Sequence, residues 1–538
     1  MKDSLNGWDV PKEERITRFD KRLSYELTGY KPITATKGLD FRPEWFTEAR
    51  DTFLRTGKYC SYPFRSKAYD DFWHEEYVRC RDGYTVNGYT LTGPNYYYLN
   101  YYQLPNIDVE KAGSGRLAVF PKFLVFQYEF FHYFEICRIL KKDVCLMKAR
   151  GVGFSEINAA ICACIYNCFR ESNCMITAQL KNYLDKSLDK AWNALSFTND
   201  NTSGGMFKLT QVHNTQYYKK SSWYKKENGQ DIETGWKSQI VGIVADTDAK
   251  IRGDRVDLLV YEEAGSNTAL RKSYIKGKAL IYIGGKKFGI RMCGGTGGDR
   301  GIALADLADM YNDPESFDVL PFYHNYTPSG DWIETAYFIP SYIGAVTEYG
   351  EDADGVKRRL LDERGYCFWE NYKEQLDYDR SKIKNPKALI EHCAEYCYTA
   401  DEAFALEGEN KFNKVLLTEQ LMRIRVLKQA PKFDYGVLKF KYESGKQHTS
   451  ENVRGVTWQS TAKGPGTIKI LEHPLWECQP KKDESGMIIW NPPDKQANLY
   501  VAGCDGIDLG KQDTSEYTKD PSDFCLVIYK RQFGLSDP

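Results

Sequence analysis

The chain has 538 residues, a length that predicts three or four domains with ample cores. Its 73 lysines and arginines almost balance its 74 aspartates and glutamates, which leaves a net charge of −1. This balance excludes binding to nucleic acid through global charge, so any such contact has to come from local patches. The 15 cysteines lie in apolar or helical contexts, which indicates a reducing compartment rather than a disulfide framework.

The N-terminal residues, MKDSLNGWDVPKEER, are polar, so we expect no signal peptide. The longest apolar run, residues 157–169, is too short to cross a bilayer and contains two asparagines. We therefore expect a soluble intracellular protein that is not secreted and contacts no membrane. Residues 1–115 form an aromatic-rich, loop-rich lead-in. Within it, residues 96–102, YYYLNYY, predict a buried strand pair rather than a surface on which bases stack.

Residues 116–410 show a regular alternation of strand and helix patterns. Apolar strands separated by helices predict an α/β fold with a mostly parallel sheet that is flanked by helices and buried on both faces. Strands are expected over residues 144–147, 174–178, 239–244, 257–262 and 289–294. Helices are expected over residues 121–140, 156–169, 181–195 and 267–282.

The cysteine clusters give no convincing metal site. Three of the clustered cysteines fall on the helix expected after residue 156, where small apolar residues pack: Cys162, Cys164 and Cys168, with Cys174 nearby. Cys393 and Cys397 are one helical turn apart, but no second pair of ligands accompanies them. We expect core packing in both places.

The most specific motif is VCLMKARGVGFSE, at residues 144–156. An apolar strand enters a turn that contains two glycines, and a hydroxyl residue and a helix follow. Glycines let backbone N–H groups surround a phosphate, the helix N-terminus adds partial positive charge, and the hydroxyl can bind Mg²⁺. We expect the loop to hold the phosphates of a nucleotide with Lys148, Arg150, Gly151, Val152, Gly153, Phe154 and Ser155, and Ser155 to bind the metal.

The loop departs from the usual pattern in its cation. The lysine that normally precedes the hydroxyl residue is replaced by Phe154, and the nearby cations, Lys148 and Arg150, lie before the glycines. Either the loop is not a nucleotide site, or the phosphate cation comes from the start of the loop.

Paired acids follow a buried strand in VDLLVYEEAG, at residues 256–265. Adjacent buried carboxylates repel each other unless they face a metal or water. Nucleotide hydrolysis needs one carboxylate to hold Mg²⁺ and another to activate water, roles that fit Glu262 and Glu263 respectively.

Two further residues complete the candidate site. In MCGGTGGD, residues 292–299, glycines around Thr296 let its hydroxyl approach the γ-phosphate and transmit hydrolysis to a neighbouring element. Gln127 lies on the helix before the first strand and can read an adenine edge with its donor and acceptor, although a surface glutamine has the same pattern.

In this order the motifs resemble the large terminase subunit of tailed bacteriophages. The matching features are Gln127, the loop at 148–155, Arg252 with Gly253, the acidic pair and the GGTGG turn, joined by similar segments at 93–103 and 398–404. The resemblance covers about residues 85–530. It implies a P-loop ATPase core that uses ATP and Mg²⁺ to move double-stranded viral DNA into a procapsid.

The resemblance also implies partners and a place of action. These are a portal protein, a small terminase subunit and a homo-oligomeric ring, in the host cytoplasm and docked transiently on the procapsid. A helicase-like DNA translocase and an inactive nucleotide-binding scaffold remain alternatives. A helicase needs a second motor lobe, and no repeat of the first lobe follows residue 301. In the scaffold alternative, Phe154 would indicate a catalytically inactive site.

The sequence departs from the family at three positions. Family members with the phosphate cation at the start of the loop exist, and Arg150 occupies that position, so we expect Arg150 to sense the phosphates, with Lys148 as the other candidate. Glu262 stands where the family usually has aspartate. The segment Tyr398-Thr399-Ala400 lacks the family's proline.

Residues 411–495 are richer in Lys, Gly and Pro and predict a linker or small subdomain, and residues 496–538 begin a new strand pattern. The family's ribonuclease-H-like nuclease opens with a strand that ends in a metal-binding aspartate, and Asp505 matches it. Two-metal cleavage needs several carboxylates from separate strands. We therefore expect an incomplete nuclease domain without independent activity, with a divalent metal at Asp505 only if the domain is complete.

DNA-contacting residues are harder to identify. Residues 217–226, YYKKSSWYKK, interleave cations and aromatic residues and can contact a phosphate backbone, but the pattern favours a solvated hairpin. Lys286 and Lys287 form a weaker candidate.

Overall fold

A computed structural model describes residues 24–105, 118–202, 215–244, 255–297, 302–351, 355–404 and 434–462, and the strand segments 468–470, 481–482, 488–489, 500–505 and 525–530. The chain divides into two compact units, Met1–Val426 and Leu427–Pro538. Within the described residues, no helix combines the length and apolar character that crossing a membrane requires.

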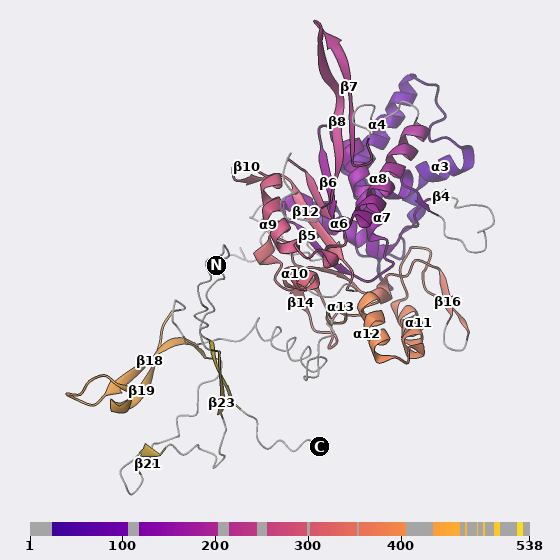
Figure 1. Ribbon diagram of the computed structural model, residues 1–538. Coiled ribbons are helices and arrows are strands. Elements are labelled where there is room, and N and C mark those ends of the chain that lie inside the picture. The colour runs from indigo at the N-terminus through magenta and orange to yellow at the C-terminus, as the bar shows by residue number, and fades with distance from the viewer. Residues whose placement is uncertain are drawn as a thin grey trace, which may run out of the picture. The chain divides into compact units, whose positions relative to one another are not determined.

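The larger unit is built around a 7-stranded sheet with the order β15-β5-β12-β9-β6-β8-β7 (Figure 1). Its strands are β15 (Tyr337–Ile339), β5 (Val144–Lys148), β12 (Ile290–Gly295), β9 (Leu258–Tyr261), β6 (Asn173–Ala178), β8 (Gln230–Val244) and β7 (Tyr218–Glu227). Neighbouring strands run parallel except β7 and β8, which form an antiparallel hairpin. The predicted α/β class and all five predicted strands are confirmed.

Helices cover both faces of this sheet. They are α6 (Val125–Leu140), α7 (Phe154–Cys168), α8 (Lys181–Thr202), α9 (Leu270–Ile281) and α10 (Ile302–Asn312), and the first four overlap the predicted helices. Successive residues of a strand point to opposite faces. On β12, a Cβ added at Gly294 would meet Phe154 of α7, whereas one added at Gly295 would meet Leu307 of α10. Therefore α7 and α10 pack on opposite faces.

The N-terminal part of the larger unit is mainly helical. It comprises α2 (Ser24–Thr28), η2 (Pro43–Phe46), α3 (Glu48–Thr56), α4 (Lys67–Asp82), β1 (Tyr84–Val86), β2 (Tyr89–Leu91), α5 (Gly93–Tyr101), β3 (Leu104–Pro105) and β4 (Ala118–Val119). Its buried aromatic residues belong to the same hydrophobic cluster as the sheet. The described residues of this region therefore share one hydrophobic core with the sheet.

The strand pair predicted for residues 96–102 is wrong, because this segment is the buried helix α5. Pro94 is the second residue of the helix, and its fixed φ and missing N–H are tolerated in this first turn. Tyr96 and Tyr101 donate hydrogen bonds to the buried carboxylate of Glu76 on α4, with Tyr101 Oη 2.6 Å from Oε2. This tertiary partner overrides the strand preference of aromatic residues.

The rest of the larger unit follows the sheet in short elements. They are η4 (Ala264–Ser266), β10 (Tyr282–Ile283), β11 (Lys286–Lys287), η5 (Glu315–Phe317), β13 (Phe322–His324), β14 (Ile333–Thr335), η6 (Ser341–Ile343), β16 (Tyr349–Glu351), β17 (Lys357–Arg359), α11 (Trp369–Lys382), α12 (Pro386–Glu395) and α13 (Ala400–Ala403). The domain boundary predicted at residue 410 lies outside the described residues.

The smaller unit contains only strands and one short turn of helix in its described residues. They are β18 (Asp434–Tyr442), η7 (Ser450–Asn452), β19 (Val453–Ser460), β20 (Ile468–Ile470), β21 (Lys481–Lys482), β22 (Ile488–Ile489), β23 (Tyr500–Asp505) and β24 (Cys525–Lys530). The strand expected near residue 498 is β23, which ends at Asp505 and pairs antiparallel with β24. The side chain of Asp505 lies outside the description, so its metal-binding role stays a prediction.

Two local predictions are confirmed. The segment 217–226 forms one strand of the β7–β8 hairpin, on which Trp223 and Tyr224 are exposed and Lys220 pairs with Glu233 at 2.6 Å. The clustered cysteines are buried free thiols: Cys162, Cys164, Cys168 and Cys174. Across the described ranges, no group of three His, Cys, Asp or Glu side chains is arranged to hold a metal.

Candidate nucleotide site

The glycine loop joins the carboxyl end of β5 to the N-terminus of α7. Gly151 has φ 88° and Gly153 has φ 76°, values in the left-handed region that favours glycine. Gly153 is the N-cap of α7, so the free N–H groups of the first helical turn face the loop. A Cβ added at Gly151 would meet no atom within 4 Å. The loop therefore has the open, N–H-rich form that a phosphate requires.

The acidic strand brings a carboxylate to this loop. Glu262 follows β9 directly and is only 4% exposed. Ser155 donates its hydroxyl to Oε1 of Glu262, and Asn158 Nδ2 donates to Oε2 at 2.8 Å. Ser155 and Glu262 are 107 residues apart in the chain. The sheet order places them together, because β12 alone separates β5 from β9.

Lys148 and Glu263 form the second contact of the site. Lys148 is the last residue of β5, and its Nζ lies 3.8 Å from Oε1 of Glu263. The Lys148 side chain is 8% exposed and that of Glu263 is 27% exposed, so both have limited access to water. Glu263 adopts φ 46°, an uncommon conformation for a residue with a side chain. Such backbone geometry concentrates at functional sites.

The Arg150 side chain binds a residue outside the acidic pair. Its guanidinium forms two hydrogen bonds with the carboxylate of Glu395, at the end of α12, and Nη2 lies 2.8 Å from Oε1. The backbone N–H of Arg150 also donates to the Glu395 carbonyl at 2.8 Å. The hydrogen bond to Glu395 raises the pKa of Arg150. The Arg150 side chain is 60% exposed. Of the two candidate cations, the structure thus places Lys148 beside the acidic pair.

Gln127 lies beneath the loop. It is 5% exposed, and its Nε2 donates to the carbonyl of Val152 at 3.3 Å. A Cβ added at Gly153 would lie 3.3 Å from the same nitrogen. In this arrangement Gln127 supports the loop backbone, and its predicted contact with adenine stays a prediction.

The GGTGG turn packs against three separate elements through its glycines. An added Cβ would lie 2.4 Å from the Phe154 ring at Gly294, 2.7 Å from the Gly265 nitrogen at Gly295 and 2.2 Å from the Ala403 carbonyl at Gly297. These distances exclude any side chain without rearrangement. Thr296 therefore lies where the glycine loop, the turn after the acidic pair and α13 meet, but its predicted catalytic role stays a prediction.

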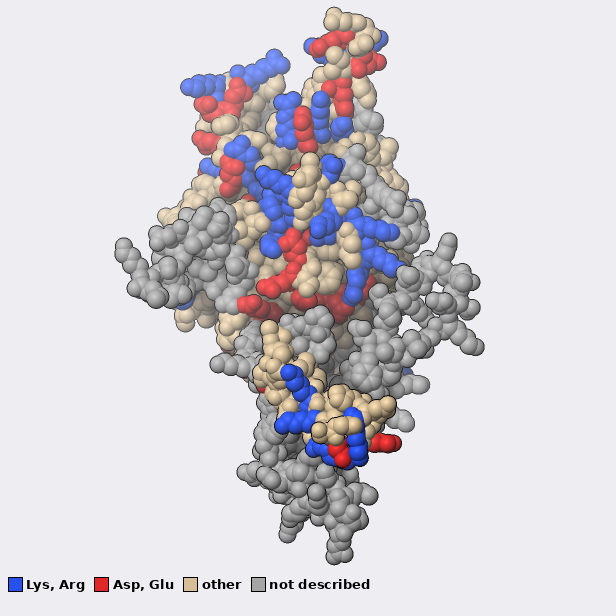
Figure 2. Space-filling view, turned by 90° about the vertical axis from the view of Figure 1, so that its left-hand side faces the viewer, with Lys and Arg blue, Asp and Glu red and all other residues tan. Residues whose placement is uncertain are grey.

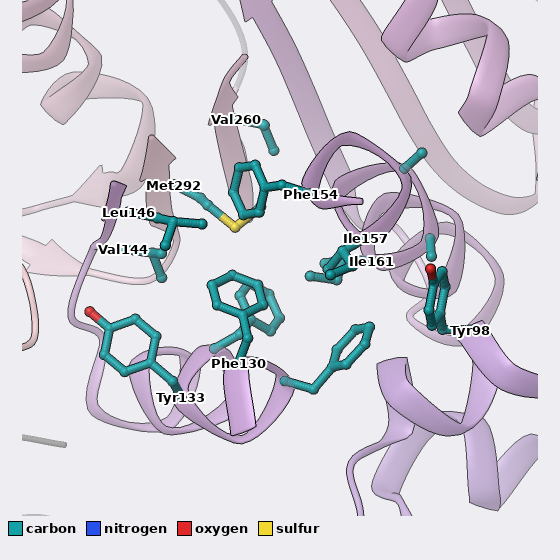
Figure 3. Packing of buried hydrophobic residues seen from close by; sticks show 14 of the residues in the cluster. Tyr98, Phe130, Tyr133, Val144, Leu146, Phe154, Ile157, Ile161, Val260 and Met292 are labelled. Carbon is teal, nitrogen blue, oxygen red and sulfur yellow. The ribbon is translucent and has the colours of Figure 1, made fainter. Parts of the chain in front are cut away.

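Phe154 occupies the core rather than the phosphate side of the loop. It is 3% exposed, and its ring lies 5.5 Å from that of Phe130 in an edge-to-face arrangement. Figure 3 shows the ring among Phe130, Val260 and Met292. Only the backbone N–H of Phe154 is therefore available to a phosphate. The residue that replaces the usual lysine is a packing residue.

Phe154→Lys is expected to destabilise the protein by about 3 kcal/mol or more, because it buries an ammonium group among apolar side chains. Phe154→Leu, a matched apolar change, should lose only about 1 kcal/mol. The free energies of unfolding in urea measure both effects. A Phe154→Lys protein as stable as wild type and faster in ATP turnover would contradict this packing role.

Two site residues were missed from the sequence. Asn158 is one helical turn after Ser155 and is a polar residue on an apolar helix, a pattern that could have revealed it. No local sequence pattern identifies Glu395, because Arg150, the residue that it contacts, is 245 residues away in the chain.

The residues around the loop fit Mg²⁺. A serine hydroxyl and a carboxylate supply the oxygen ligands that this ion prefers, and Mg²⁺ sites commonly use only one or two carboxylates together with substrate phosphates. Ser155 and Glu262, joined by a hydrogen bond, would hold the ion. ATP fits as the phosphate donor because the loop offers backbone N–H groups and Lys148 offers a cation.

No family model and no curated protein matches the chain. Among solved structures, it is similar to the large terminase ATPase domain of Thermus phage P74-26, with 13% identity and a TM-score of 0.31, over 48% of this chain and 88% of that one. It is also similar to the large terminase of bacteriophage HK97, with 9% identity and a TM-score of 0.31, over 56% and 53%. A third is the large terminase of a thermophilic bacteriophage in complex with ADP, with 11% identity and a TM-score of 0.22, over 34% and 39%.

These solved structures are large terminases, the family that the ordered motifs resemble. Their identities and TM-scores are low, so we take no residue role from them.

Proposed function

We propose that this chain is the ATP-hydrolysing motor subunit of a large terminase and moves double-stranded viral DNA into a procapsid. The observation that carries the proposal is the Ser155–Glu262–Asn158 cluster at the end of the glycine loop. It joins the phosphate loop to the acidic strand in the arrangement that Mg²⁺-dependent nucleotide hydrolysis needs.

In the proposed reaction the loop N–H groups from Gly151 to Ser155 hold the phosphates of ATP. Ser155 and Glu262 would hold Mg²⁺, which when bound would neutralise charge that develops on the phosphate oxygens. Lys148 contributes a positive charge at the base of the loop. Glu263 orients and deprotonates the attacking water, and its carboxylate lies 3.8 Å from the Lys148 ammonium before the substrate arrives. Thr296 transmits the loss of the γ-phosphate to α13, against which the adjacent Gly297 packs.

The wider setting is also part of the proposal. The active form is a homo-oligomeric ring that docks on the procapsid in the host cytoplasm and works with a portal protein and a small terminase subunit. Asp505 is proposed as the first metal ligand of a ribonuclease-H-like nuclease domain. Support for these points comes from the order of the motifs.

ATP turnover with and without DNA tests the proposal. We expect Mg²⁺-dependent turnover that double-stranded DNA stimulates severalfold. Absence of turnover in every condition would favour the inactive scaffold. Stimulation by single-stranded DNA together with strand separation would favour the helicase-like translocase.

A further inference from the structure

The segment from residue 264 to residue 298 is strongly basic. It contains seven cations and no aspartate or glutamate, in a chain whose net charge is −1. The cations are Arg271, Lys272, Lys276, Lys278, Lys286, Lys287 and Arg291. A local charge excess of this size in a nearly neutral protein needs an explanation.

Three of these cations are bound to acids from other elements. Arg271 contacts Asp306 and Asp309 of α10. Lys287 lies 2.8 Å from Asp143 and from Asp318, and Arg291 donates to Asp143 at 2.7 Å. These three stabilise the packing between elements.

Four further cations of the segment are exposed, and we call this set the α9 lysine face. It comprises Lys272, Lys276 and Lys278 on α9, and Lys286 in the β10–β11 hairpin. Figure 2 looks onto the side of the protein on which Figure 1 labels α9 and β10, and shows Lys and Arg gathered there. These lysines add positive charge to one exposed side of the unit, and a polyanion is the kind of ligand that such charge attracts.

The helix that carries this face is fixed to the acidic strand. Tyr261, directly before Glu262, donates its hydroxyl to the Ser273 carbonyl on α9 at 3.0 Å. A Cβ added at Gly277 would lie 2.5 Å from the same hydroxyl oxygen, so the helix approaches β9 closely. A force applied to the α9 lysine face would therefore be transmitted through these direct contacts to β9, the strand that ends beside the acidic pair.

We propose that the α9 lysine face binds the phosphate backbone of double-stranded DNA during translocation. This inference rests on the proposed function, because it identifies the DNA-contacting surface of that motor. Lysines bind phosphates as point charges and do not read base sequence, which suits a motor that moves along any sequence.

Charge reversal tests the inference. The variant Lys272→Glu/Lys278→Glu/Lys286→Glu should bind a short fluorescent DNA duplex of mixed sequence at least tenfold more weakly, measured by anisotropy. The slope of log affinity against log salt concentration should fall by about 3, since each phosphate contact contributes about 0.9. A second variant with glutamine at the same positions should weaken binding in the same direction, and circular dichroism should show that both remain folded.

The matched control is Lys382→Glu/Lys384→Glu/Lys387→Glu, which reverses three exposed lysines at the end of α11, in the connection to α12 and in the first turn of α12. It should keep wild-type DNA affinity and salt slope. Unchanged DNA binding in the α9 variants, or equal losses in the control, would overturn the inference. Wild-type protein that binds DNA through α9 but does not hydrolyse ATP would instead overturn the proposed ATPase and leave the DNA surface standing.

Discussion

Glu263→Gln is expected to lower ATP turnover about 10²–10⁴-fold while leaving ATP affinity within about threefold of wild type. The amide has nearly the shape of the carboxylate but cannot accept a proton from water. Glu263 contacts Lys148, whereas the loop hydroxyl of Ser155 is bonded to Glu262, so phosphate and metal binding should persist. Turnover by phosphate release and affinity by equilibrium binding of a fluorescent ATP analogue separate the two effects.

A matched control for this substitution is Glu351→Gln on β16, an exposed position in another part of the unit. It should leave both turnover and affinity unchanged. If the Glu263→Gln variant turned over ATP at the wild-type rate, Glu263 would not be the catalytic base. Parallel loss of turnover and ATP affinity would move Glu263 to the binding of nucleotide rather than the activation of water.

The sheet and its helices could be predicted from the sequence because buried parallel strands are continuous apolar runs and the helices between them have a clear period. The motifs at strand ends could also be predicted, because the carboxyl ends of parallel strands lie at one edge of the sheet. This arrangement brings Ser155 and Glu262 together. Helix α5 was not predictable, since the tyrosines that favour a strand are held in a helix by Glu76.

The orientation of individual side chains was the harder part of the site. The sequence shows Phe154 in the position of a lysine, but only the structure shows that Gly294 opposite it leaves room for the ring. Gln127 was found by its place before the first strand, whereas its hydrogen bond to the loop depends on tertiary packing. The choice between Lys148 and Arg150 depends on Glu395, which is far away in the chain.

This geometry leads us to propose Lys148 as the phosphate cation in place of Arg150. Lys148 is the last residue of β5, a strand within the sheet, and its Nζ lies 3.8 Å from the Glu263 carboxylate. Arg150 would have to leave a doubly hydrogen-bonded carboxylate before it could reach a phosphate. A preorganised charge in a site with little water contributes more to catalysis than one that has to reorganise first.

Lys148→Met should therefore lower kcat/KM for ATP about 10²–10³-fold, because it removes the charge but keeps the apolar stem. Arg150→Ala should lower it less than about tenfold, since its charge is already compensated by Glu395. Glu395→Gln provides the decisive comparison. If Arg150 does not touch the phosphates, freeing it leaves ATP affinity unchanged. If Arg150 senses them, the same substitution tightens ATP binding and Arg150→Ala becomes the more damaging change, which would return the assignment to Arg150.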